Sequence, residues 1–245
     1  MRLLVPELAS HEVDLVVPAT LAGRTTDERI RRRLTVKDPY VTRLGLEQLS
    51  EINVDPMILS SLSHDDDYFV LALQCRYRPE VDGDDAPFVD SRIGVKFSAP
   101  DSARQPVALA LAPDSASAAS GRGLRIALTV PTGTGIDPSV EYASDGTREK
   151  RYITAHGRGE SDPEWHLSDA PGHPLVGDIR LAMVVCAPAN TKVLAEVIVA
   201  ASLRRLGKLR TRAELPPSLH TIDLSVAARP ALFDGPAGEL APGAR

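Results

Sequence analysis

The chain has 245 residues, a hydrophobic share of 43% and a formal net charge of −5. This length permits one large domain or two small ones, and the apolar share is sufficient for a real core. A mildly acidic chain lacks the net basic surface that nucleic-acid-binding proteins usually present, so we expect no nucleic acid among its partners. The excess of arginine over lysine and the abundance of alanine, proline and glycine are typical of a GC-rich bacterial genome.

The two cysteines, Cys75 and Cys186, each lie in an apolar run, and the sequence has no Cys-x-x-Cys pair. We therefore expect two buried thiols in a reducing compartment, with a disulfide between them as the alternative. The first residues meet Glu7 and Glu12 too early to form the apolar region of a signal peptide, and no apolar run is long enough to cross a bilayer. These features predict a soluble, cytoplasmic protein without a membrane partner.

The first predicted elements are two strands near the N-terminus. Apolar and polar side chains alternate over residues 12–17, which indicates a strand with one buried face. Residues 24–36 are ambiguous, because Thr25 and Glu28 have the spacing of a helix capping box while the following apolar residues alternate as in a strand. We favour a strand that pairs with the first one as a hairpin. One face of it would then carry Arg29, Arg31 and Arg33.

Residues 38–63 carry the clearest helix signals of the sequence. Asp38-Pro39 and Asp55-Pro56 each place a side-chain acceptor at an N-cap and a proline at the first helical position. Proline is tolerated there because its missing N–H would have no partner within the helix. We predict a small helical insert over residues 38–63, made of two short helices.

Strand signals return after this insert. Residues 68–78 and 88–99 are apolar or alternating, and a turn-rich acidic loop separates them, so we predict that they form a hairpin. A short strand is expected at 106–112. Residues 114–123 contain no large apolar side chain and are rich in serine, alanine and glycine, which is typical of a linker or a flexible loop.

The second half of the chain alternates strand and turn signals. Residues 179–187 and 193–203 are the strongest apolar runs, and a strand around Trp165 precedes them. Trp165 and Leu167 should point into the core and His166 outward. Further strands are expected at 124–132, 139–143, 150–156, 208–215 and 220–226.

About a dozen short strands predict a mainly β protein, an antiparallel β-sandwich (one large or two small) with the small helical insert near residues 38–63. We expect an N-terminal β-rich domain over 1–113, a C-terminal β-sandwich over 124–228 and a flexible tail over 229–245, with a single domain as the alternative. Residues 68–99 and 179–203 also resemble each other weakly, since each has an apolar strand with a cysteine near its end, a loop and a second apolar strand.

The common catalytic motifs are missing from the sequence. Residues 131–135 are Pro-Thr-Gly-Thr-Gly, but neither the lysine nor the helix start of a phosphate-binding loop follows. The sequence has no Gly-x-Ser-x-Gly motif, and neither cysteine has polar neighbours that would activate it. We expect no cofactor.

One segment has the residue types of a metal site. His156, His166 and His173 lie close together in the sequence, with acidic residues between them, and imidazoles and carboxylates are ligands of zinc and iron. If residue 156 lies on a strand beside the Trp165 strand, the rings of His156 and His166 can meet. The competing interpretation is a solvated polar face, because the spacing matches no known ligand pattern.

The function that these observations favour is a non-catalytic protein-interaction or assembly module, an accessory component of a bacterial cytoplasmic multi-protein system. Its partner would be another protein or a second copy of the chain. One alternative is a metal-dependent hydrolase that uses the region from His156 to His173. A second alternative is a self-assembling structural subunit with strand edges that pair between chains.

Overall fold

The computed structural model describes residues 2–4, 8–19, 26–51, 62–78, 86–114, 127–129, 152–169, 175–204 and 208–227. These residues form mostly strands, as predicted. The helical segments are α2 (Leu46–Glu51), α4 (Pro217–His220) and the 3-10 turn η1 (Leu224–Val226). The strands are β1 (Arg2–Leu4), β2 (Ser10–Val17), β3 (Glu28–Lys37), β4 (Tyr40–Leu44), β5 (Asp66–Tyr77), β6 (Phe88–Ser98), β7 (Val107–Ala112), β8 (Ala127–Thr129), β9 (Ile153–His156), β10 (Glu164–Ser168), β11 (Gly177–Pro188), β12 (Leu194–Arg204), β13 (Lys208–Glu214) and β14 (Thr221–Asp223).

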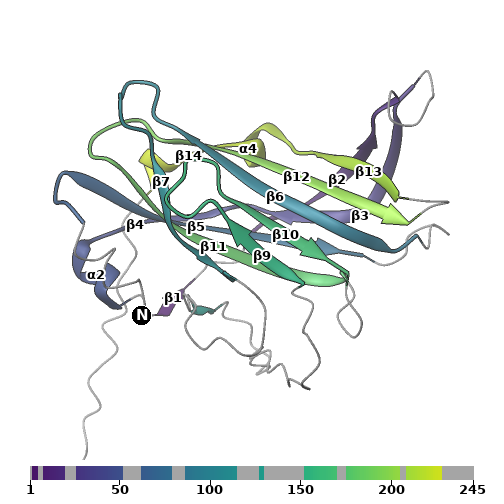
Figure 1. Ribbon diagram of the computed structural model, residues 1–245, viewed down its shortest axis with the longest axis horizontal. Coiled ribbons are helices and arrows are strands. Elements are labelled where there is room, and N and C mark those ends of the chain that lie inside the picture. The colour runs from purple at the N-terminus through teal and green to yellow at the C-terminus, as the bar shows by residue number, and fades with distance from the viewer. Residues whose placement is uncertain are drawn as a thin grey trace, which may run out of the picture.

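One 12-stranded sheet contains every described strand except β1 and β8, which pair with each other. Its strands follow the order β7-β11-β5-β3-β2-β13-β12-β6-β10-β9, with β4 beside β5 and β14 beside β12 (Figure 1). The two ends of this order approach each other. The N–H of Ala155 donates to the carbonyl of Asp114 at 2.8 Å, and that of Gly159 to Ala108 at 2.7 Å. The sheet therefore coils into a nearly closed antiparallel barrel.

The predicted sandwich is not confirmed, because the strands form one continuous sheet rather than two stacked ones. Strands from residues 1–113 and 124–228 alternate within it, since β11 lies between β5 and β7 and β12 beside β6. Both segments contribute side chains to the same large core. The largest fully buried side chain in that core is Trp165, whose Nε1–H donates to the carbonyl of Pro113 at 3.1 Å.

The predicted hairpin of residues 68–99 is wrong. β5 pairs along its whole length with β11, while β6 pairs with β12 and β10. Each of these strands has a long apolar face, and burying that face against an equally long partner outweighs pairing with the next strand in the sequence. As a result, the two segments with similar sequence patterns pair strand by strand, β5 with β11 and β6 with β12.

The predicted hairpin of β2 and β3 is confirmed, but its arginines do not share one face. The register shifts from Val13 opposite Leu34 to Leu15 opposite Ile30, so the sheet bulges at the intervening arginines. Arg32 has a φ of 58° at this bulge. The bulge breaks the two-residue alternation. Consequently Arg31 is exposed, whereas Arg33 is 0% exposed.

The helical insert is much smaller than predicted. The residues after Asp38-Pro39 form β4, which pairs with β5, and only α2 is helical in the described part of 38–63. Asp38 caps no helix, because β4 follows it. Its carboxylate instead contacts Nε2 of His11 at 2.7 Å. The helix begins after Gly45, whose N–H donates to Oε1 of Gln48 at 2.8 Å. The second predicted helix lies in residues 52–61, outside the described ranges.

The remaining predicted strands divide into confirmed and undescribed ones. β7, β10, β11, β12 and β13 occur where they were expected, and the last strand is shorter than predicted because η1 replaces its second half. β8 lies within the predicted strand 124–132, and β9 corresponds to the last four residues of the predicted strand 150–156. Residues 130–151 and 228–245, which include the predicted strand 139–143 and the predicted tail, lie outside the described ranges. No helix in the described part is long and apolar enough to cross a membrane.

Candidate functional site

The two described histidines of the predicted metal region lie together on the outer face of the barrel. β9 and β10 pair so that His156 is opposite Glu164 and His166 is opposite Thr154. Trp165 and Leu167 point into the core, as predicted from the alternation of the strand. The rings of His156 and His166 therefore meet on the solvent side, with their centroids 4.9 Å apart and their planes tilted by 58°.

A carboxylate orients one of these rings. Oε1 of Glu164 lies 2.5 Å from Nε2 of His166, and both side chains are about one-third exposed, at 37% and 35%. An ionised carboxylate accepts hydrogen bonds only, so in the neutral imidazole this contact places the ring proton on Nε2 and leaves Nδ1 of His166 as an acceptor. On the next strand, Gly94 is opposite Glu164 and the exposed Arg92 is opposite His166.

The other described members of the predicted region do not complete a metal centre. His173 lies outside the described ranges. Asp169 is turned toward Arg204, with 3.8 Å between Oδ2 and Nη2. Within the described residues, no group of three or more His, Cys, Asp or Glu side chains could hold a metal ion. A closed four-ligand site of the structural zinc type is therefore not formed by these residues.

The cysteines are free and are not activated. Cys75 is buried on β5, and burial raises the pKa of its thiol to about 12. Cys186 is half-buried on β11, and burial raises the pKa of its thiol although Arg104 and Tyr68 oppose that shift. The thiolate is the reactive form of cysteine, so both side chains are poor nucleophiles at neutral pH. The expectation of two unpaired thiols without a disulfide is confirmed.

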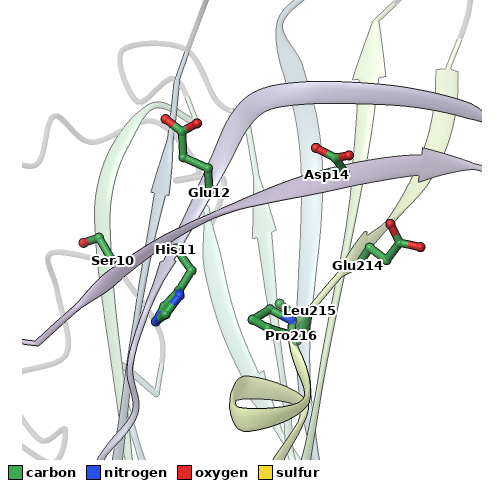
Figure 2. A pocket seen from close by; sticks show the side chains of 7 residues that line it. All are labelled: Ser10, His11, Glu12, Asp14, Glu214, Leu215 and Pro216. Carbon is green, nitrogen blue, oxygen red and sulfur yellow. The ribbon is translucent and has the colours of Figure 1, made fainter.

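A second feature, which the sequence did not indicate, is an open groove beside β2. It has a volume of about 680 Å³ and lies where β13 ends and the chain turns into α4 (Figure 2). Three carboxylates and two apolar side chains contribute to its lining. The residues that line the groove are Ser10, His11, Glu12, Asp14, Glu214, Leu215 and Pro216.

The groove exposes the backbone edge of a strand. β13 pairs with β2 only at residues 14–16, and no other described strand pairs with the first half of β2 on this side. On the opposite side, the carbonyl of Ala9 accepts the N–H of Asp38 at 2.8 Å. Backbone groups alternate in direction along a strand, so those of Ser10 and Glu12 point into the groove.

Proline is the reason why β13 stops pairing with β2 at this point. After Glu214 the chain continues with Leu215, Pro216 and Pro217. A proline has no N–H to donate to a neighbouring strand, so the β13 ladder stops there. α4 then redirects the chain to β14, which pairs with β12 instead of β2. The adjacent prolines were visible in the sequence, but which strand edge they would uncover depended on the tertiary pairing.

Each carboxylate of the groove has at least one arginine partner. Arg29 bridges to Glu214 at 2.6 Å and approaches Asp14 at 3.6 Å, Arg31 approaches Asp14 at 3.8 Å, and Arg78 contacts Glu12 at 2.9 Å. These arginines contact the carboxylates from outside the lining set, which itself contains no arginine or lysine. Three arginines therefore match the three carboxylates of the lining.

No known protein-family model matches the chain, and no curated protein shows significant similarity to it. A fold alone does not specify a function, so function is inferred from the geometry of these two surfaces.

Proposed function

We propose that the protein is a non-catalytic interaction module, an accessory component of a larger bacterial assembly, which binds an extended segment of a protein partner in the groove beside β2. The observation that carries this proposal is that no described strand pairs with β2 at Ser10 and Glu12 on the groove side. An extended segment that enters the groove adds a strand to the sheet there, and its main-chain hydrogen bonds supply affinity.

Charge selects the partner. Glu12, Asp14 and Glu214 can exchange their arginine partners for lysine and arginine side chains of the bound segment, while Leu215 and Pro216 offer contact to an apolar one. Two copies of this chain would meet less favourably, because antiparallel pairing of two β2 edges brings their carboxylates together. A different protein is therefore the favoured occupant over a second copy of the chain.

The metal-dependent hydrolase and the self-assembling subunit remain alternatives. The first receives support only from the ring contact of His156 and His166, which is two imidazoles rather than the three protein ligands of most catalytic zinc sites. Sedimentation of the purified chain tests the second, because a self-assembling subunit sediments as an oligomer.

Selection from a phage library of random linear peptides tests the proposal. Enriched peptides should alternate basic and apolar residues and should bind in an extended form. Glu12→Pro removes an N–H that points into the groove but leaves the β2–β3 ladder, so it should abolish binding. Glu214→Lys should weaken binding by reversing a charge on the rim.

Glu196→Lys is the matched control for the charge change. Glu196 is a similarly exposed carboxylate, at 45% against 51% for Glu214, but it lies on β12 outside the groove. This variant should keep full binding. Peptides that bind Glu12→Pro as well as the wild type, or a library that enriches no sequence, would refute the proposal.

A further inference from the structure

The contact of His156 and His166 supports an inference that is independent of the groove. We propose that these two imidazoles form an open, two-ligand site for a late first-row divalent metal ion, with Cu²⁺ bound more tightly than Zn²⁺ or Ni²⁺. Water would fill the other coordination positions. The expected ion follows from the ligand type and from the order of divalent metal affinities, which peaks at copper.

The sheet holds the two rings in place. They project from adjacent paired strands on one face, and a centroid separation of 4.9 Å allows one nitrogen of each ring to reach a shared ion. Core packing holds both strands, since Trp165 of β10 lies in the core and Ile153 and Ala155 of β9 pack against it. The two strands therefore need little further ordering when the ion binds.

Glu164 prepares one ligand rather than acting as a third. Its contact with Nε2 of His166 keeps the proton on that nitrogen and leaves the lone pair of Nδ1 free for a metal. Histidines that bind metals usually donate their second nitrogen to a carboxylate in this way.

The surroundings allow an ion to enter. Gly94 has no side chain, and a Cβ built there would meet only the Cβ of Glu164, at 3.9 Å. The space beside the carboxylate is therefore open. Arg92 is paired opposite His166. Its positive charge weakens the affinity for a metal ion but leaves the rings accessible from the Gly94 side. Hard ions such as Mg²⁺ prefer oxygen ligands and should not bind.

Titration calorimetry of the full chain with CuCl₂, ZnCl₂ and MgCl₂ tests the inference. His156→Ala and His166→Ala should each weaken Cu²⁺ affinity at this site at least about tenfold, and Glu164→Gln should weaken it by roughly tenfold. Electron spin echo spectra of the Cu²⁺ complex should show two coupled imidazoles in the wild type and one in each single histidine variant.

His220→Ala is the matched control. His220 also has a carboxylate neighbour, Oε1 of Glu196 at 3.4 Å from its Nε2, and it has a similar exposure of 38%. It has no second histidine beside it among the described residues, so its substitution should leave the site intact. Equal Cu²⁺ affinity in wild type and His156→Ala, a single coupled imidazole in the wild type, or comparable binding of Mg²⁺ would overturn the proposal.

Discussion

Arg33 and Arg31 lie two residues apart on one strand, yet the bulge in β3 gives them opposite environments. The side chain of Arg31 is 75% exposed, whereas Arg33 is fully buried. Nε of Arg33 donates to the carbonyl of Arg78 at 2.9 Å, and Nη2 to that of Ala86 at 2.5 Å. Its guanidinium carbon also lies 5.1 Å from the centre of the Phe88 ring. Replacing each arginine by methionine separates these environments.

Arg33→Met should cost about 2–4 kcal/mol of unfolding free energy. Each hydrogen bond from a charged group is worth about 1.5–3 kcal/mol, and the contact with Phe88 about 2 kcal/mol when desolvated. Removing a buried charge offsets several kcal/mol of that loss. Arg31→Met should change stability by less than about 0.5 kcal/mol, as most surface substitutions do.

Urea unfolding followed by tryptophan fluorescence measures both variants. Trp165 is the only tryptophan and is fully buried, so its emission reports loss of the core directly. The midpoint should fall for Arg33→Met while the slope stays constant. If the two variants lost equal stability, or if Arg33→Met lost none, the bulge and the inward direction of Arg33 would be refuted.

Two further predictions concern a glycine pair and a buried thiol. Gly157 has a φ of +84°, and a Cβ there would lie 2.7 Å from the Cα of Pro163, so Gly157→Ala should destabilise the fold by roughly 1–3 kcal/mol. At Gly94 a Cβ has room, so Gly94→Ala should cost less than about 1 kcal/mol. Thermal melts in which Gly94→Ala lowered the melting temperature more than Gly157→Ala would contradict this packing. Burial raises the pKa of Cys75 from 9.0 to about 12, so the folded state keeps a proton that the unfolded chain loses. Its contribution to stability is complete below pH 9 and is lost as the pH rises toward 12. Cys75→Val should therefore lose less unfolding free energy than the wild type between pH 9 and pH 12, as measured by urea unfolding at each pH. Equal losses in the two proteins would contradict the prediction.

Local features of the fold followed from the sequence. The alternation in residues 12–17 and 208–215 and the apolar runs at 179–187 and 193–203 predicted strands that the structure contains. The inward direction of Trp165 and the outward direction of His166 were also correct. Each of these depends on the two-residue period of a strand, which is a property of neighbouring residues.

Tertiary structure decided which strands pair, and with that both candidate sites. β5 and β6 are consecutive apolar strands, but they pair with β11 and β12, because several strands of similar length and apolarity compete and only their combined burial selects one arrangement. The bulge that buries Arg33 depends on the register of β2 with β3, and the lack of a described partner strand at Ser10 and Glu12 depends on where β13 stops pairing with β2. The meeting of His156 and His166 was predicted only on the condition that β9 lies beside β10, and that condition depends on contacts between strands rather than on the pattern within one.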